Sequence, residues 1–241
     1  METYQAVFKR KEVKYLLTEA QLAALRPALE THMEPDAFAH SSISNLYYDT
    51  PDFRMLRRSQ EKPVYKEKLR LRSYGVPDEE TQVFPEIKKK AEGIVYKRRV
   101  SMSYGDAIRY LSRRRPGEDG QIFQELNWML LAYGSLAPRI FLSYERDSWK
   151  GREDPYLRLT LDREILWRTE ALDLRRGAWG EPLLEPNQVL MEVKISNAAP
   201  LWLAEALSEN EIFPISFSKC GRAFDTLCKN YINEMEIKRY A

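Results

Sequence analysis

Seven short segments of the chain alternate charged with apolar residues, and this alternation constrains the fold more than any other feature of the sequence. In a β-strand, residues two apart point to the same face of the sheet. Within KLRLR, for example, Lys68, Arg70 and Arg72 share one face, and Leu69 and Leu71 share the other. The pattern predicts an antiparallel sheet with one apolar face and one charged face.

The predicted charged face is rich in Lys and Arg. Strand by strand, its members are Arg10, Glu12 and Lys14; Lys68, Arg70 and Arg72; Glu86, Lys88 and Lys90; Lys97 and Arg99; Tyr144 and Arg146; Arg158, Thr160 and Asp162; and Glu192 and Lys194. In any single strand, a face turned toward water shows the same alternation. A solvated face usually mixes Thr, Ser, Gln and Glu with its lysines, however, and like charges directly opposite one another destabilise a sheet. Several basic strands side by side therefore indicate a bound polyanion.

The repulsion between such cations is large enough to require a ligand. Two cations ~6 Å apart at an effective dielectric of ~20 repel by roughly 3 kcal/mol, and converging cations multiply the number of such pairs. A polyanion turns that repulsion into binding energy, and the few carboxylates on the same face suit a hard divalent metal that bridges phosphate oxygens. The residue types thus favour phosphoryl transfer, in which positioning and charge neutralisation do most of the catalytic work.

Other catalytic classes lack the residues that they need. The chain has two histidines, His32 and His40, which we interpret as surface or loop residues, and this argues against histidine-based triads and most zinc sites. It has no G-x-x-x-x-G-K-[ST] or G-x-G-x-x-G motif, so lysines and arginines must hold any nucleotide phosphates. Lys+Arg total 38 and Asp+Glu total 36, a balance that argues against a nucleic-acid partner.

The remaining features favour a single cytoplasmic domain. The first residues, METYQAVFKRKEVKY, lack the apolar core of a signal peptide, and no stretch approaches the roughly 20 apolar residues of a membrane helix. Cys220 and Cys228 lie too far apart in one predicted helix for a disulfide, which is typical of a reducing compartment. We find no linker long enough to separate two domains and expect residues 1–241 to form one.

The periodicities predict an α+β fold. We expect strands at 7–17, 43–48, 65–74, 82–90, 94–102, 138–149, 156–165 and 189–195. Helices are expected at 18–32, 53–58, 106–113, 122–132, 202–207 and 221–235. Thr18 and Gln21 suggest a capping box, and Asp49 is the expected N-cap of the second helix. In the last helix, Phe224, Leu227, Cys228, Tyr231 and Ile232 form one stripe that predicts core packing.

Nine motifs occur in one order along nearly the whole chain, from about Phe8 to Phe224. They are FKRKEVKYLL, SNLYYDT, KLRLRSYG, FPEIKKK, YKRRV, SYERDSW, LRLTLD, MEVKI and FSKCGRAF. This ordered set resembles the VTC domain, the polyphosphate polymerase domain of the vacuolar transporter chaperone family, which is a branch of the triphosphate tunnel metalloenzymes. The resemblance implies a closed antiparallel tunnel β-barrel of about eight strands with helices packed outside.

The resemblance also implies that the tunnel binds ATP and inorganic polyphosphate, and that Mn²⁺ or Mg²⁺ assists transfer of the γ-phosphate onto the growing chain. The residues implied as catalytic phosphate ligands are Lys14, Arg70, Arg72, Lys88, Arg146, Arg158 and Lys219. Further ligand contacts are expected from Arg10, Lys68, Lys97, Arg99, Tyr144, Lys194 and Ser218. Glu192 is the implied metal ligand, and Glu12 and Glu86 are expected to assist the metal or orient neighbouring cations.

Two positions depart from the family pattern. Many tunnel hydrolases begin with E-x-E-x-K, whereas this chain has Arg10, Glu12 and Lys14, which favours the polymerase branch over a two-metal hydrolase. Ser216 occupies a position that is basic in the eukaryotic polymerases, so one phosphate contact is lost. The sequence therefore leaves three alternatives open: a polyphosphate polymerase, a metal-dependent triphosphatase or tripolyphosphatase, and a non-catalytic polyphosphate or nucleotide sensor. It also leaves open a membrane-protein partner.

Overall fold

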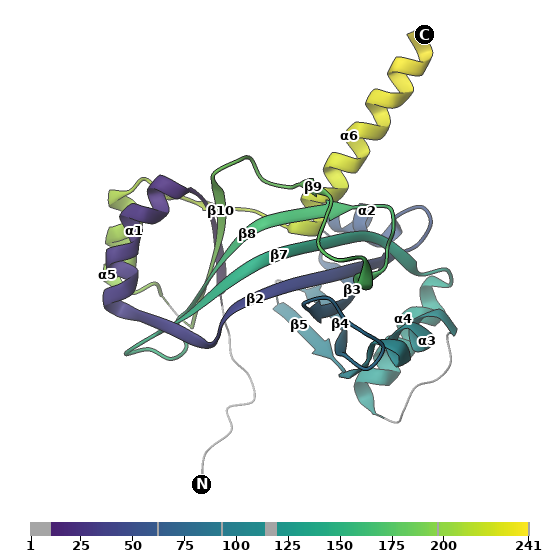
Figure 1. Ribbon diagram of the computed structural model, residues 1–241, viewed down its shortest axis with the longest axis horizontal. Coiled ribbons are helices and arrows are strands. Elements are labelled where there is room, and N and C mark those ends of the chain that lie inside the picture. The colour runs from purple at the N-terminus through teal and green to yellow at the C-terminus, as the bar shows by residue number, and fades with distance from the viewer. Residues whose placement is uncertain (1–10, 62, 93, 114–119, 197, 241) are drawn as a thin grey trace. The chain divides into compact units, whose positions relative to one another are not determined.

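A computed structural model describes residues 11–61, 63–92, 94–113, 120–196 and 198–240, with the side chains of 113 and 233–240 outside the description. It shows an α+β fold with a large antiparallel sheet (Figure 1). The strands are β1 (Lys11–Thr18), β2 (Met33–Asp49), β3 (Tyr65–Tyr74), β4 (Gln82–Ala91), β5 (Ile94–Arg99), β6 (Met102–Ser103), β7 (Ala137–Gly151), β8 (Arg158–Arg168), β9 (Glu181–Pro182), β10 (Gln188–Ile195) and β11 (Pro214–Ile215). The helices are α1 (Glu19–His32), α2 (Arg54–Gln60), α3 (Tyr104–Arg113), α4 (Gln121–Tyr133), the 3-10 helix η1 (Leu174–Arg176), α5 (Leu201–Glu209) and α6 (Lys219–Tyr240).

The sheet has the strand order β11-β1-β10-β8-β7-β2-β3-β4-β5, with β6 beside β4 and β9 beside β8. The predicted α+β class and antiparallel sheet are therefore confirmed. Over the described residues the strand pairs form an open order that begins at β11 and ends at β5. Closure of this sheet into a barrel stays a prediction.

The chain divides into two compact units. Unit 1 comprises residues 1–41, 144–165 and 184–217. Within it, β1 pairs with β10 and β10 with β8, and α1 and α5 lie side by side (Figure 1). Its core joins the apolar face of these strands, including Leu17, Leu159 and Met191, to Leu25 of α1 and Leu203 of α5. The alternation predicted from the sequence therefore places one face of these strands against helices.

Unit 2 comprises residues 42–143, 166–183 and 218–241. Within it, β2, β3, β4 and β5 pair in that order. The core contains Leu69, Leu71 and Ile87 from the strands, and α3 and α4 contribute residues such as Leu111 and Met129. In this unit too, helices cover the apolar face of the sheet, and the charged residues of the same strands lie on the opposite face.

Asp49 supports α2 in a different way from the one expected. The N-cap of α2 is Phe53, whose backbone is left-handed with φ of 55°, and Asp49 is the last residue of β2. The buried Asp49 carboxylate nevertheless accepts hydrogen bonds from the backbone N–H groups of Met55 and Leu56, both at 2.9 Å. It thus satisfies donors of the first helical turn from outside the helix.

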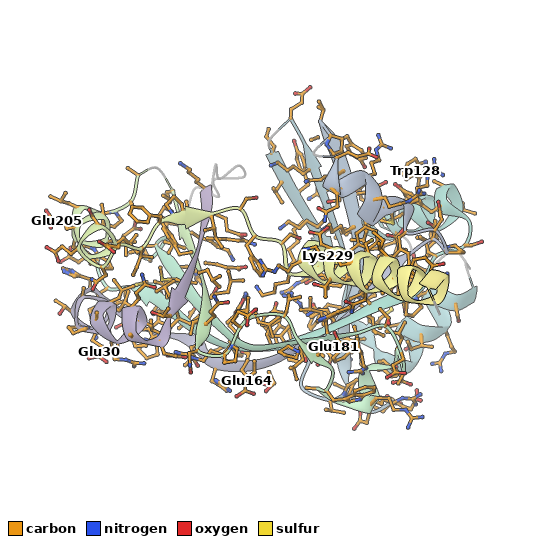
Figure 2. All side chains as sticks on the ribbon, turned by 90° about the horizontal axis from the view of Figure 1, so that it is seen from above. Glu30, Trp128, Glu164, Glu181, Glu205 and Lys229 are labelled. Carbon is orange, nitrogen blue, oxygen red and sulfur yellow. The ribbon has the colours of Figure 1, made fainter. Side chains whose placement is uncertain are left out.

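Two other local expectations have opposite outcomes. The capping box at the start of α1 is confirmed. The backbone N–H of Gln21 donates to Thr18 Oγ1 at 3.1 Å, and the side-chain Oε1 of Gln21 accepts from the backbone N–H of Thr18 at 3.0 Å. The expected core stripe of α6 is confirmed at Phe224, which packs on Phe53 of α2 with ring centroids 5.4 Å apart; Leu227 is half-buried, and the prediction is wrong for the other three residues. Cys228, Tyr231 and Ile232 are exposed, on the part of α6 that Lys229 marks in Figure 2.

Two expectations about the helices concern cysteine pairing and membranes. Cys220 and Cys228 are both free thiols. In the part of the chain that the structure describes, no helix combines the length and the apolar character needed to cross a membrane.

Candidate functional site

The arginines and carboxylates at the centre of the charged face are largely withdrawn from water, whereas its other members Lys88, Lys90, Lys97, Arg99 and Arg158 are exposed. The side chains of Glu86, Arg72, Glu192, Arg146 and Arg70 are 1%, 7%, 8%, 15% and 18% exposed, respectively. A solvated sheet face would expose most of its charged atoms, because isolated charges are costly to remove from water. The alternation of the sequence therefore reflects a charged face that is buried around Glu86 and Glu192 and exposed along β5 and at Arg158.

In unit 1, Glu12, Lys14, Arg146, Asp162 and Glu192 form one group, here called the Glu192 cluster. Lys14 lies directly opposite Glu192 in the β1–β10 ladder. Its Nζ is 3.1 Å from Glu192 Oε1 and 3.4 Å from Glu12 Oε1. The antiparallel register thus brings two carboxylates to one lysine, and the sequence spacing of Glu12 and Lys14 places both on the same face of β1.

Arg146 of β7 links the two other carboxylates of the Glu192 cluster. Its Nε and Nη2 donate to the two oxygens of Asp162, at 2.6 and 2.7 Å, and Nη2 also lies 3.2 Å from Glu192 Oε2. The guanidinium carbon is 5.1 Å from the centre of the Tyr144 ring. The side chain of Asp162 is fully buried, and sequence reasoning did not assign it to the site although it shares a face of β8 with Arg158.

The other predicted residues of unit 1 lie near this cluster on the same strands. Thr160 is opposite Glu192 in the ladder, and its buried hydroxyl has no hydrogen-bond partner. Lys194 lies opposite both Glu12 and Arg158. Arg158 is about half exposed and pairs with Asp36 of β2 instead of with Glu192. Arg10 lies outside the described residues.

In unit 2, Asn45, Arg70, Arg72, Glu86 and Lys97 form a second group, here called the Glu86 cluster. Glu86 Oε2 lies 2.6 Å from Arg70 Nε and 4.0 Å from Arg72 Nε, and Oε1 lies 3.0 Å from Lys97 Nζ. One buried carboxylate thus faces three cations, which come from β3 and β5 on either side of it.

The charges of the Glu86 cluster shift the acidities of its members. Burial alone would raise the pKa of Glu86, but Arg70, Arg72 and Lys97 outweigh burial and lower the pKa to about 2. The pKa of Lys97, whose side chain is 44% exposed, is lowered to about 8, because partial desolvation of its amine and the repulsion of Arg72 and Arg70 exceed the attraction of Glu86. The cluster therefore holds its carboxylate as an anion and has one lysine that loses its proton easily.

Two neutral side chains of β2 complete this arrangement, and sequence reasoning missed both. Asn45 Oδ1 accepts a hydrogen bond from Arg72 Nε at 3.0 Å, while Asn45 Nδ2 donates to the Leu142 carbonyl at 3.1 Å. The hydroxyl of Tyr47 accepts from Arg70 Nη1 at 3.3 Å. The available signal was their spacing, because two residues apart on one strand they share a face.

Basic residues of unit 2 also face one another across neighbouring strands. Lys68, Lys88 and Lys97 are directly opposite one another on β3, β4 and β5. Lys68 Nζ donates to Ser218 Oγ at 3.3 Å, just before the buried Lys219 begins α6. Arg99 lies opposite Glu86, and its guanidinium carbon is 4.8 Å from the centre of the Phe84 ring. This row of like charges is the arrangement that a bound polyanion would stabilise.

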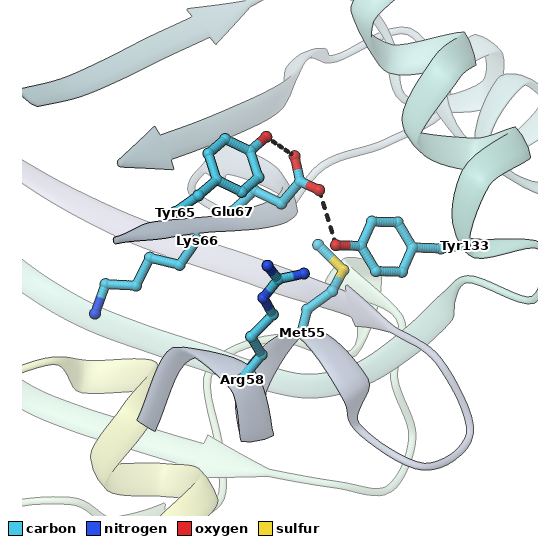
Figure 3. A pocket seen from close by; sticks show the side chains of 6 residues that line it. All are labelled: Met55, Arg58, Tyr65, Lys66, Glu67 and Tyr133. Carbon is cyan, nitrogen blue, oxygen red and sulfur yellow. Dashed lines mark hydrogen bonds between the residues drawn. The ribbon is translucent and has the colours of Figure 1, made fainter. Parts of the chain in front are cut away.

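The opposite face of β3 carries a buried carboxylate, that of Glu67, which lies apart from the charged face. Glu67 is buried in a hollow that Met55, Arg58, Tyr65, Lys66 and Tyr133 also line (Figure 3). The hydroxyls of Tyr65 and Tyr133 donate to its two oxygens at 2.7 and 2.8 Å. Both carboxylate oxygens are thus satisfied by phenols that reach toward them from β3 and α4. We interpret this group as an anchor between the sheet and α4.

The donor atoms of the Glu192 cluster fit a metal held by few protein ligands. The described residues contain no group of three or more His, Cys, Asp or Glu side chains arranged to hold a metal. Mg²⁺ usually keeps several waters and uses one or two carboxylates together with substrate phosphates. Glu192 with Glu12 supplies such a carboxylate pair, and the unpartnered hydroxyl of Thr160 opposite Glu192 could bond a metal-bound water.

Comparison with known proteins gives one matching family model and several similar solved structures. The family model of the VTC domain matches residues 9–228. Comparison with curated proteins gives no match. A solved structure from Bacillus halodurans, described as a "putative adenylate cyclase", aligns at 15% identity with a TM-score of 0.56 and covers 88% of this chain and 94% of its own. One from Vibrio parahaemolyticus with the same description has 13% identity and a TM-score of 0.48, and covers 91% and 99%.

The match to the family model spans nearly all residues of the chain, which therefore belongs to the VTC domain family, a branch of the triphosphate tunnel superfamily. The antiparallel sheet, with cations and buried carboxylates on its charged face, agrees with this membership.

Proposed function

We propose that this protein is an ATP-dependent polyphosphate polymerase, which transfers the γ-phosphate of ATP onto a polyphosphate chain with the help of a divalent metal. The observation that supports the proposal most directly is the Glu86 cluster, where Arg70, Arg72 and Lys97 surround one buried carboxylate. A polyanion is the ligand that such a buried excess of positive charge would bind most strongly.

The chemistry asks little of the protein beyond positioning and charge. In phosphoryl transfer, charge is spread over the oxygens of the moving group, so that fixed cations stabilise the transition state without a protein nucleophile. The proposed phosphate contacts are Lys14, Arg70, Arg72, Lys88, Lys97, Arg146, Arg158 and Lys219, with Arg10, Lys68, Arg99, Tyr144, Lys194 and Ser218 as further ligand contacts. VTC family membership supports a closed tunnel and a single domain, which we include in the proposal.

A bound Mn²⁺ or Mg²⁺ would neutralise charge on the phosphoryl oxygens. We propose that Glu192 holds this ion and that Glu12 assists. Glu86 is better suited to orienting cations, because both of its oxygens already lie close to Arg70 or Lys97. Lys14, which pairs with Glu192 here, would then be released toward the substrate phosphates, whereas Arg146 would lose its contact with Glu192 and stay bound to Asp162.

The proposal is tested by product analysis. Purified protein is incubated with ATP and Mn²⁺, and the products are sized on a gel and assayed for ADP and orthophosphate. Long-chain polyphosphate together with ADP is the expected result. Orthophosphate as the sole phosphate product would contradict polymerase activity and would favour a triphosphatase.

One observation favours a second candidate. Ser216 adjoins β11 and is exposed, and it provides no charge where eukaryotic polymerases have a cation. A polyphosphate or nucleotide sensor would bind triphosphate without turnover, and the missing cation supports that reading. Tight binding without ADP formation at any tested metal would favour the sensor. The two free cysteines agree with the cytoplasm as the proposed compartment.

A further inference from the structure

Arg72 and Arg146 are both held at the Nε edge of the guanidinium by a buried side chain, but the two partners differ in charge. Asp162 accepts hydrogen bonds from Nε and Nη2 of Arg146 and places one negative charge beside the guanidinium. Asn45 accepts a hydrogen bond from Nε of Arg72 and carries no charge. Both partners are fully buried. Within unit 2, residue 45 thus fixes the guanidinium of Arg72 without placing a negative charge beside it.

Asn45 is itself fixed in one orientation. Its amide nitrogen donates to the Leu142 carbonyl of β7, so the amide oxygen is the atom turned toward Arg72. Asn45 and Arg72 are also direct partners in the β2–β3 ladder. A neutral acceptor anchored at both ends can hold a guanidinium in place without reducing its charge.

We infer that Asn45 is a positioning residue that orients Arg72 for a phosphate group without adding to the negative charge that Glu86 already places near it. An aspartate at this position could still accept from Arg72 Nε, but it would add a negative charge beside the guanidinium and could not donate to the Leu142 carbonyl. The identity of residue 45 therefore sets how strongly the Glu86 cluster binds a polyphosphate chain. This inference rests on the proposed function, since it assumes that Arg72 contacts phosphate.

The test measures binding of inorganic tripolyphosphate to the full chain by titration calorimetry, without turnover. Asn45→Asp keeps the shape of the side chain, adds one charge and removes the donor to the Leu142 carbonyl. Asn127→Asp is the matched control, because the Asn127 oxygen accepts from the Tyr110 hydroxyl at 2.7 Å, away from the Glu86 cluster. Each variant is combined with Arg72→Ala in a double-mutant cycle, which separates an effect through Arg72 from a general loss of structure.

Asn45→Asp is expected to weaken tripolyphosphate binding by about tenfold or more and to make binding less sensitive to salt. Asn127→Asp should bind as the wild type does. In the Arg72→Ala background, Asn45→Asp should weaken binding by a clearly smaller factor than it does in the presence of Arg72. If Asn45→Asp does not fold, Asn45→Ser, which is too short to reach Arg72 Nε, should weaken binding with the same dependence on Arg72.

Two results would overturn the inference, and they are distinguishable. A wild-type protein that binds no tripolyphosphate, with or without Mn²⁺, would overturn the proposed function and the role of Asn45 with it. Wild-type binding with unchanged affinity in Asn45→Asp, or with effects of residues 45 and 72 that simply add, would overturn the role of Asn45 alone.

Discussion

Lys14 and Glu192 face each other across the β1–β10 ladder, and their side chains form an ion pair with an Nζ–Oε1 distance of 3.1 Å. Glu192 also lies within 3.2 Å of Arg146, so two cations compensate this nearly buried carboxylate. A metal ion or a phosphate group that enters must exchange with these partners. Binding in the Glu192 cluster therefore replaces the present ion pairs by new ones. The present ion pairs reduce the free-energy cost of burying these charges while no ligand is bound.

Glu192→Gln should lower metal-dependent turnover by about 100-fold or more, because the variant loses the proposed protein ligand of the metal. Initial rates of ADP formation over a range of Mn²⁺ concentrations measure the effect. Glu12→Gln is the matched control and should lose less, since Glu12 is more exposed and contacts only Lys14 among the residues of the Glu192 cluster. Wild-type rates in Glu192→Gln would remove the metal assignment.

Arg72→Ala should weaken ATP binding more than it changes the melting temperature. Arg72 supplies charge to the proposed ligand, and its removal also relieves repulsion between Arg72 and the neighbouring cations of the cluster. Arg98→Ala serves as the control, because Arg98 pairs with Glu125 of α4 at 3.6 Å. Nucleotide affinity and thermal melts are measured for both variants. Equal ATP affinity in Arg72→Ala and the wild type would show that Arg72 does not face the ligand.

Glu86 should make the stability of the protein depend on pH in the acid range. Its pKa in the folded protein, about 2, is below its ordinary value of 4.5, so its ion pairs stabilise the fold fully above pH 4.5 and are lost as the pH falls toward 2. Glu86→Gln should therefore cost about 3 kcal/mol of unfolding free energy at neutral pH. Urea unfolding at several pH values should show this difference shrinking with acidification. A constant difference would contradict the assignment.

Tripolyphosphate binding near pH 8 should take up protons through Lys97. The pKa of Lys97 is lowered to about 8, so a fraction of the lysines is neutral in the free protein at that pH. A bound polyanion favours the charged form and raises the pKa, and each complex then gains part of a proton. Calorimetry in buffers of different ionisation enthalpy measures this uptake. It should be smaller in Lys97→Met, and equal heats in all buffers for the wild type would refute it.

Tyr133→Phe should destabilise the fold and leave ligand binding unchanged. The variant removes the 2.8 Å hydrogen bond to Glu67 and leaves one buried carboxylate oxygen without its donor, at a cost of about 1–3 kcal/mol. Urea unfolding and tripolyphosphate titration are compared with Tyr65→Phe, which removes the donor to the other oxygen. Weakened binding at unchanged stability would mean that the hollow of Glu67 belongs to the ligand site.

The sequence predicted the two faces of the sheet because strand periodicity is a local property. Alternation in KLRLR alone places Leu69 against the core and Arg70 on the charged face, and the structure confirms this. Local patterns could not give the partners. The pairing of Arg146 with Asp162 depends on which strands become neighbours, and the roles of Asn45 and Tyr47 are hidden because neutral residues leave no charge signal.

Two parts of the fold were predicted wrongly, the start of β2 and the exposed half of α6. The structure extends β2 back to Met33, whereas residues 33–42 contain few of the apolar or β-branched residues that indicate a strand. In α6, the apolar spacing of Tyr231 and Ile232 indicated a buried stripe, but both residues are exposed. Periodicity shows that a helix has an apolar face and does not show whether another element packs against it. A helix can present a suitable face where no other element of the chain covers it.

The carboxylate of Asp49 has a consequence for hydrogen exchange. Amides in the first turn of a short helix usually exchange fast, because they have no acceptor within the helix and the end frays. In α2, the amides of Met55 and Leu56 instead donate to a fully buried side chain that belongs to β2. These two amides should therefore exchange with deuterium only when β2 and α2 separate. Their exchange rate would then measure how often that contact opens.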